Sequence, residues 1–125
     1  MGNPVGWFEI YVDDLDRAKS FYQGVLGISL QALPSPEGDV AQMLAFPMDP
    51  EGSGTSGALV RIGDDRPLGN SVIVYFTCDD CSVEGSRVAE NGGEIFKEKF
   101  SIGEYGFIVL ATDTEGNMFG LHSMQ

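Results

Sequence analysis

Few side chains in this sequence suit acid–base chemistry, and two of them stand out by their surroundings. Glu9 lies in an aromatic stretch near the N-terminus, and His122 is the only histidine. Partial burial would raise the pKa of a carboxyl group toward values that suit proton transfer, and an imidazole titrates near neutral pH. Glu9 and His122 are therefore the candidate catalytic acid and base. The alternatives are a structural hydrogen-bond network for Glu9 and a solvated position near the chain end for His122.

Three aromatic residues are candidates for ligand contact together with Glu9 and His122. Trp7, Tyr11 and Tyr75 each stand at alternate positions of a predicted strand. In residues 7–12 the other positions are wholly apolar, so alternation turns Trp7, Glu9 and Tyr11 to the opposite face, where they suit a pocket wall. Packing on a sheet is the other interpretation of these aromatic side chains.

The two cysteines form the pattern C-x-x-C, at Cys78 and Cys81, where a strand is predicted to lead into a helix. The start of a helix can lower a thiol pKa, and this spacing occurs in redox and metal sites. However, no second C-x-x-C is present to complete a zinc site, and Cys78 stands where the first half of the chain has the packing residue Val12. We therefore expect Cys78 to be buried and unreactive.

Strand and helix signals place these residues on two similar sets of elements. A helix should begin after Asp13 or Asp14 and end at Gly27, with an apolar stripe that faces inward. This stripe consists of Leu15, Ala18, Phe21, Tyr22, Val25 and Leu26. Strands are predicted over residues 28–33, 40–46 and 58–62, and residues 48–57 form a Gly- and Ser-rich loop that is either a lid or a plain connector.

The second half repeats this order with an offset of 66 residues, which aligns Asp14 with Asp80 and Gly27 with Gly93. Its elements are a strand at 71–77, a helix at about 81–91, and strands at 94–100, 107–111 and 118–122. Two strand–helix–three-strand modules, at about 5–62 and 71–122, indicate an internal repeat within a single domain spanning residues 1–125. The fold class is α+β, with two curved sheets side by side, helices outside and a concave cup between the sheets.

Composition excludes several classes of function. The chain has 125 residues and a net charge of −12, which argues against nucleic acid and anionic membranes as partners. No apolar run approaches the length of a membrane span, and the N-terminus lacks the features of a signal peptide. Two cysteines do not make a disulfide framework, so a reducing cytoplasm is the expected location.

Two motifs resemble the vicinal oxygen chelate superfamily of glyoxalases, extradiol dioxygenases and bleomycin-resistance proteins. They are V-x-D-L-D-R-A-x-x-F-Y-x-x-V-L-G at residues 12–27 and D-x-x-G-N-x-F-x-L at residues 113–121. The resemblance implies the two-module fold, commonly as a homodimer. It also implies metal ligands at the positions of Trp7, Ile73 and Gly120 and within residues 57–60, none of which offers a ligand side chain. We therefore expect no metal and no other cofactor.

The predicted function is binding of a small organic molecule in an aromatic-lined cup, as a bleomycin-resistance-like protein would do. The ligand-binding residues would be Trp7, Glu9, Tyr11, Tyr75 and His122. The alternative is a lyase or isomerase of the glyoxalase type that uses Glu9 and His122 as acid and base, or an atypical metal site. Gly120 should leave room for a ligand beside His122. A structural or regulatory interaction domain has no positive feature in its favour.

Overall fold

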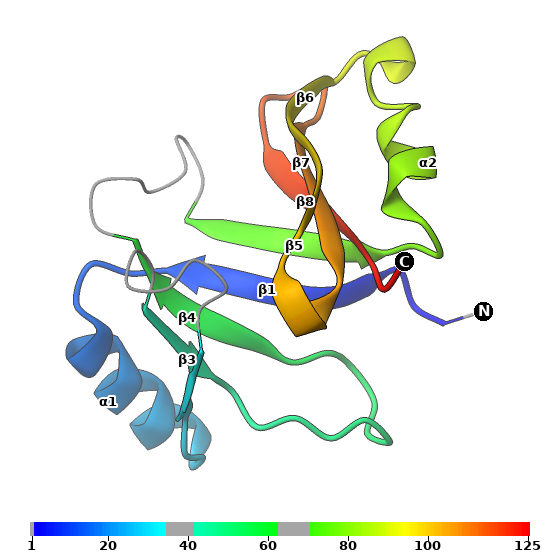
Figure 1. Cartoon of the computed structure of the whole chain (residues 1–125). Coiled ribbons are helices and arrows are strands. Elements are labelled where there is room, and N and C mark those ends of the chain that lie inside the picture. Colours follow the sequence, from blue (N-terminus) through cyan, green and yellow to red (C-terminus); the bar gives the residue numbers. More distant parts are fainter. Residues whose placement is uncertain (1, 35–41, 63–70) are drawn as a thin grey trace. The chain divides into compact units, whose positions relative to one another are not determined.

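The computed structural model describes residues 2–34, 42–62 and 71–125 (Figure 1). The chain divides into two compact units, of which the first is Trp7–Val72. The second consists of Met1–Gly6 and Ile73–Gln125. Strand β1 therefore begins in the second unit and continues into the first. Residues 2–6 are held there because Thr77 N–H donates to the Pro4 carbonyl, at 2.9 Å.

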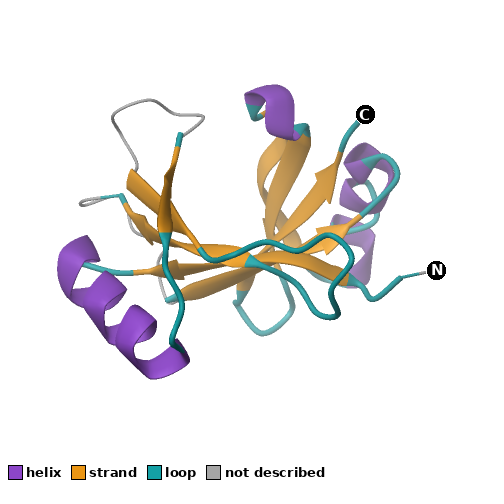
Figure 2. Cartoon of the chain, turned by 90° about the horizontal axis from the view of Figure 1, so that it is seen from below, coloured by secondary structure: helices purple, strands orange, loops and turns teal. Residues whose placement is uncertain are grey.

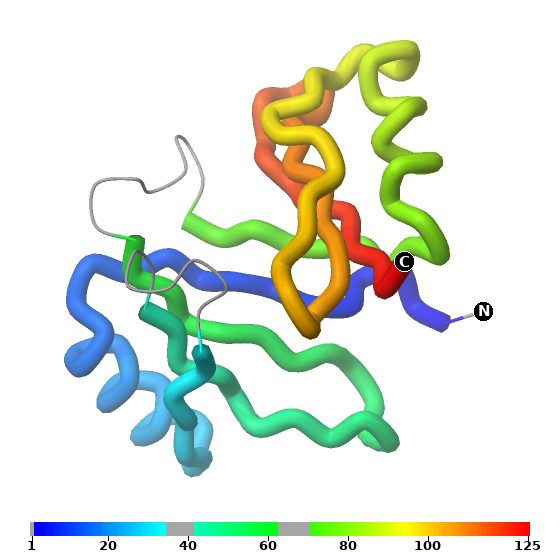
Figure 3. Tube along the Cα trace, viewed as in Figure 1, coloured from blue at the N-terminus to red at the C-terminus, as the bar shows by residue number. Residues whose placement is uncertain are grey.

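The first unit contains one helix and a sheet with the strand order β2-β3-β4-β1. Strand β3 is antiparallel to β2 and β4, and β4 is parallel to β1. Figure 3 colours these elements in chain order, from blue at β1 to green at β4. The bounds are β1 (Val5–Tyr11), α1 (Leu15–Leu26), β2 (Gln31–Leu33), β3 (Gln42–Ala45) and β4 (Gly57–Arg61).

Helix α1 begins and ends where the sequence predicted. Asp14 is the N-cap, and its carboxylate accepts a hydrogen bond from the Arg17 N–H at 3.0 Å. Gly27 ends the helix in the left-handed conformation, with φ 65°, which a residue without Cβ adopts at low cost. Both caps satisfy backbone groups that the helix itself leaves unpaired.

The expected inward stripe of α1 is only partly correct. Leu15, Ala18 and Tyr22 are half-buried, and the Tyr22 ring packs edge-on against Phe46 with a centroid distance of 5.8 Å. Three other members of the stripe are exposed: Phe21 at 60%, Val25 at 64% and Leu26 at 55%. In Figure 2 the sheet of the first unit lies on one side of this helix.

The second unit has the strand order β5-β8-β7-β6, with β5 parallel to β8 and the remaining pairs antiparallel. Its core combines the buried Cys81, Val109 and Leu121 with partly buried residues that include Phe76 and Phe119. The bounds are β5 (Val72–Thr77), α2 (Cys81–Gly85), β6 (Glu94–Ser101), β7 (Phe107–Thr112) and β8 (Met118–Ser123), with short 3-10 turns at Ala89–Asn91 and Gly103–Tyr105.

The second predicted helix is shorter than expected. The sequence predicted one helix over about residues 81–91, but α2 ends at Gly85 and a separate 3-10 turn covers Ala89–Asn91. Glycine lowers helix stability by about 1 kcal/mol relative to alanine, and this stretch has few apolar residues to compensate. The α+β class and the strand–helix–three-strand order of each half are nevertheless confirmed. Among the described residues, no helix has the length and apolar character needed to cross a membrane.

Candidate functional site

The first candidate site lies on the face of β1 that points away from α1. Phe8 defines the helix side, because its ring packs against Phe46, which in turn contacts Tyr22 of α1. The centroid distance between the Phe8 and Phe46 rings is 5.6 Å. Successive strand residues point to opposite faces, so Glu9 and its neighbours two positions away lie on the other face. This is the orientation that sequence alternation predicted for Glu9.

On this face the Glu9 carboxylate is held by two aromatic donors. The Tyr11 hydroxyl donates to Oε1 at 2.7 Å, and the Trp7 indole Nε1 donates to Oε2 at 3.4 Å. Tyr11 is buried, whereas Trp7 and Glu9 are half-buried. We call these three residues the Glu9 cluster. A carboxylate fixed in this way presents its oxygens at defined positions beside an indole surface.

The neighbouring strand gives the Glu9 cluster an apolar surround. Glu9 is paired with Ala58 and Tyr11 with Val60 on β4. Both β4 residues are buried, at 0% and 2% exposure. The β4 residues paired with Glu9 and Tyr11 are therefore apolar.

The second candidate site lies on the second unit, where β5 and β8 are parallel neighbours. Tyr75 is paired with Gly120 and Thr77 with His122, so Tyr75 and His122 share one face. The opposite face carries Phe119 and Leu121, which pack in the core with Cys81 of α2. Tyr75 and His122 thus lie on the face of this sheet that α2 does not cover.

The expected space beside His122 is occupied. A Cβ atom added at Gly120 would clash with the ring of Tyr75, which lies directly over the glycine. Tyr75 itself is 7% exposed. The prediction that Gly120 leaves room for a ligand is therefore wrong, because the aromatic ring of the paired strand fills the volume that a side chain at position 120 would take.

The His122 imidazole is anchored by a backbone carbonyl. Its Nε2 lies 2.6 Å from the carbonyl oxygen of Tyr105, in the 3-10 turn Gly103–Tyr105. A carbonyl oxygen only accepts, so this contact assigns the proton to Nε2 and leaves Nδ1 as an acceptor. Among the described residues, no other hydrogen-bond partner of this ring is present.

The residues predicted to form one site are thus found as two groups. Trp7, Glu9 and Tyr11 are brought together in the first unit. Tyr75 and His122 share a face of the second unit. A joint acid–base role of Glu9 and His122 stays a prediction.

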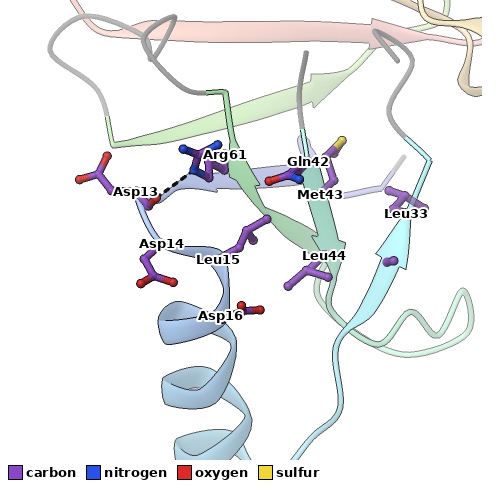
Figure 4. Close-up of a pocket in the computed structure, with 10 residues that line it drawn as sticks. Asp13, Asp14, Leu15, Asp16, Leu33, Gln42, Met43, Leu44 and Arg61 are labelled. Atoms are coloured by element: carbon purple, nitrogen blue, oxygen red, sulfur yellow. Dashed lines mark hydrogen bonds between the residues drawn. The ribbon is translucent and has the colours of Figure 1, made fainter. Parts of the chain in front are cut away.

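A pocket that the sequence did not predict lies on the helix side of the first unit (Figure 4). Its volume is about 680 Å³, and it is open to solvent. Leu44 of its lining is in register with Leu59 of β4, which is paired with Ile10, so the pocket faces away from Glu9. The pocket is lined by Asp13, Asp14, Leu15, Asp16, Ala32, Leu33, Gln42, Met43, Leu44 and Arg61.

This pocket has an acidic rim that is already used by the fold. Asp14 caps α1, and the Arg61 guanidinium Nε donates to the Asp13 carbonyl at 3.0 Å. In the sequence, this rim corresponds to the run of aspartates at the start of the helix. Capping of the helix and contact with solvent account for these aspartates. The pocket therefore adds no side chain with an evident chemical role.

The residues at the family's metal positions do not fit a divalent ion. Trp7, Ile73 and Gly120 carry no donor that zinc, manganese, nickel or iron would use, and residues 57–60 are Gly, Ala, Leu and Val. Tyr75 also fills the volume that a glutamate at position 120 would need. Across the described ranges, no group of three or more His, Cys, Asp or Glu side chains is arranged to hold a metal ion.

The C-x-x-C pair is not arranged as a reactive thiol centre. Cys78 and Cys81 are both free thiols. Cys81 is fully buried, but Cys78 is only half-buried, so the prediction that Cys78 is buried is only partly correct. Burial, helped by the nearby Glu84 carboxylate, raises the pKa of Cys78 to about 11. A raised pKa lowers the thiolate fraction at neutral pH, and the thiolate is the reactive form.

Comparisons with known proteins agree with this fold. Residues 5–43 match the family model "Bleomycin resistance protein-like N-terminal". The chain is 25% identical over 116 residues to "Putative glyoxylase CFP32" of Mycobacterium tuberculosis and of Mycobacterium bovis. These matches cover 92% of this chain but 42% of each relative, so the chain spans about two fifths of the length of the curated relatives it matches.

Solved structures show the same architecture at low sequence identity. Methylmalonyl-CoA epimerase from Mycobacterium tuberculosis superposes with a TM-score of 0.72 at 16% identity, covering 98% of this chain and 88% of that one. A variant of the Streptomyces coelicolor epimerase, in complex with 2-nitronate-propionyl-CoA, gives 0.73 at 15% identity, covering 98% and 95%. A hypothetical protein from Bacillus halodurans gives 0.74 at 13% identity, covering 97% and 94%. These matches show that the chain has the glyoxalase/bleomycin-resistance-like fold, and its two sequence motifs resemble those of the vicinal oxygen chelate superfamily.

Proposed function

We propose that this protein binds a small organic molecule at the Glu9 cluster and does so without a divalent metal. The observation that carries the proposal is the Glu9 carboxylate, oriented by Tyr11 and Trp7 on the face of β1 away from α1. An oriented carboxylate recognises a hydroxyl, amine or amide N–H of a ligand, and the indole ring offers a surface for stacking. The family-model match to bleomycin-resistance-like proteins supports binding as the activity.

The charge of the chain favours a neutral or cationic ligand. The sequence holds 19 acidic and 7 basic residues, and the polar group of the Glu9 cluster is itself an anion. A polyanionic ligand such as a CoA thioester would need basic side chains to offset its phosphates. The ligand class therefore differs from the CoA derivative held by the Streptomyces epimerase variant.

Tyr75 and His122 are proposed as further ligand contacts. They share one face of the second unit, and His122 keeps Nδ1 for interaction because Nε2 is engaged by the Tyr105 carbonyl. Replacement of His122 by Gln tests this role separately from Glu9. A loss of ligand affinity in His122→Gln would support this role, and an unchanged affinity would contradict it.

The second candidate function is a lyase or isomerase in which Glu9 and His122 transfer protons. It is favoured by the likeness of the fold to methylmalonyl-CoA epimerase. Incubation with methylmalonyl-CoA in deuterated water tests it, because epimerisation exchanges the proton at the carbon between the two carbonyl groups. Exchange that is lost in Glu9→Gln would favour the enzyme and contradict the binding proposal.

Trp7 makes the binding proposal measurable, because it is the only tryptophan in the chain. Fluorescence titration with bleomycin and with neutral and cationic aromatic compounds should change the Trp7 emission. The Glu9→Gln variant should bind roughly five- to hundredfold more weakly, since a hydrogen bond to a charged group is lost.

The matched control is Glu51→Gln, which makes the same chemical change at an exposed position of the same unit. Its affinity should equal that of the wild type. If no compound of this panel changes the emission, or if Glu9→Gln binds as tightly as the wild type, the proposed site is wrong.

A further inference from the structure

We propose that Asn91 is a site of spontaneous covalent modification, at which the asparagine is converted to aspartate or isoaspartate. Asn91 and the next residue, Gly92, are both exposed. Of the four asparagines in the chain, Asn91 is the one that precedes a glycine. The reaction joins a backbone nitrogen to the preceding asparagine side chain, so it is favoured where the next residue has no Cβ to obstruct the approach. Sequence and exposure together therefore indicate this pair.

The reaction needs only the chain itself and water. The Gly92 backbone nitrogen attacks Cγ, the carbonyl carbon of the Asn91 side chain. A bond forms between that nitrogen and Cγ, the bond from Cγ to Nδ2 breaks, and Nδ2 takes up the proton lost by the Gly92 nitrogen and leaves as ammonia. Water then opens the five-membered ring at one of its two carbonyl carbons, which gives aspartate or isoaspartate. No oxidant or reductant takes part, and each product carries one more negative charge than the original chain.

In the folded chain both reacting nitrogens are held by hydrogen bonds. The Gly92 N–H donates to the Ala89 carbonyl at 3.1 Å, and the Asn91 Nδ2 donates to the Arg87 carbonyl at 2.8 Å. The first bond engages the nitrogen that attacks, and the second holds the amide that leaves. Modification therefore requires local opening of the 3-10 turn Ala89–Asn91.

This turn has few contacts that would keep it closed. It is a separate 3-10 turn of three residues that follows the end of α2 at Gly85, and no residue of the turn is buried. Short exposed segments open locally at a free-energy cost well below that of global unfolding. Asn91 should therefore react in the native chain, but more slowly than in the unfolded chain, where the turn is absent.

The products change the junction between this turn and strand β6. An aspartate at position 91 cannot donate to the Arg87 carbonyl, and isoaspartate adds a methylene group to the backbone. The junction has little room, because a Cβ at Gly93 would clash with the Thr112 carbonyl oxygen. Strand β6 begins at the next residue, Glu94, which is paired with Thr112. Modification should therefore weaken the start of the β6–β7 pairing.

Peptide mapping by mass spectrometry tests the proposal on the native wild-type chain, incubated at mildly alkaline pH. Asn91 should acquire the mass of a carboxyl group, and the chain unfolded in urea at the same pH should react at least about tenfold faster, because its turn is open in every molecule. Asn117 is the internal control, because Met118 follows it and its amide donates to the Asp113 carboxylate. A native chain that stays unmodified while the unfolded chain reacts, equal rates in the two states, or equal modification of Asn117 would each overturn the proposal.

Isoelectric focusing of two variants provides a second test. Asn91→Gln keeps an amide at this exposed position but requires a larger ring, so the acidic form should not accumulate, whereas the matched variant Asn117→Gln should acidify as the wild type does. Amide hydrogen exchange at Gly92 reports the opening of the same hydrogen bond, so urea below the unfolding transition should speed exchange and modification together. An acidic form that accumulates equally in Asn91→Gln, or a modification rate that does not follow exchange, would contradict the proposal.

Discussion

The ring of Tyr75 on β5 lies directly over Gly120 of β8, and the two residues are paired in the parallel ladder. The resemblance to the vicinal oxygen chelate superfamily implies a glutamate ligand at the position of Gly120. In this protein the glycine is required by the aromatic ring, because any Cβ would clash with it. A side chain at position 120 and the Tyr75 ring in its observed place therefore exclude each other.

Replacement of Gly120 by alanine should destabilise the protein by about 1–3 kcal/mol, because an extra methyl group overpacks a filled volume. Urea denaturation measures this change in the free energy of unfolding. In a Tyr75→Ala background the same replacement should be much less harmful, since the clashing ring is gone. Gly24→Ala is the control: nothing lies within 4 Å of its added Cβ, so it should be neutral or stabilising. Equal costs at positions 24 and 120 would contradict the proposed overlap.

Replacement of Tyr11 by phenylalanine should lower the free energy of unfolding by about 1–2 kcal/mol, because the buried hydroxyl donates to the Glu9 carboxylate at 2.7 Å. Chemical denaturation monitored by Trp7 fluorescence would measure this change in the free energy of unfolding. Tyr22→Phe makes the same chemical change, and among the described residues the Tyr22 hydroxyl has no hydrogen-bond partner, so this control should cost little. If the effect of Tyr11→Phe is the same in a Glu9→Gln background, the two side chains are not coupled.

Features set by local sequence were predicted well. The caps of α1 at Asp14 and Gly27 depend on adjacent residues, so spacing alone located them. The orientation of Glu9 was also predictable, because alternate residues along a single strand point to opposite faces. By contrast, a helix over about residues 81–91 was predicted from a capping residue and from weak apolar spacing. The observed helix α2 ends earlier, at Gly85.

Features that join distant residues were not predicted. The overlap of Tyr75 with Gly120 depends on which strands pair and in which register. The contact of His122 with the Tyr105 carbonyl depends on a turn 17 residues earlier in the chain. The exposure of Phe21 and Val25 could not be predicted from periodicity, because helical spacing does not tell which apolar side chains the sheet covers.

Cys78 should react slowly with thiol reagents near neutral pH and faster as the pH approaches its raised pKa of about 11. Labelling rates measured across pH in the native Cys81→Ser variant would isolate this thiol. Burial is the main cause of the raised pKa, and the Glu84 carboxylate adds to it, so Glu84→Gln should lower the pKa and speed labelling. Rapid modification of Cys78 at neutral pH, or a native disulfide with Cys81, would show that this assignment is wrong.

The last prediction concerns the start of α2, where Asp80 meets Lys99. The Asp80 carboxylate accepts hydrogen bonds from the Lys99 ammonium at 2.9 Å and from the Ser82 backbone and hydroxyl. These donors, Lys99 first, lower the pKa of Asp80 from 3.8 to about 2. A carboxyl group that binds its proton less tightly in the folded state stabilises the fold above its unfolded pKa.

The stability difference between wild type and Asp80→Asn should therefore be constant above about pH 5 and should shrink as the pH falls from 4 toward 2. Thermal melting of both proteins across this range measures it. Asp16→Asn, which changes an exposed aspartate in the first turn of α1, is the control. Its stability difference from the wild type should not change when Lys99 is replaced. Lys99→Met should reduce the pH dependence of the wild type, because the largest cause of the lowered pKa is removed. A melting difference that is the same at pH 2 and pH 6 would mean that the Asp80–Lys99 pair does not form in solution.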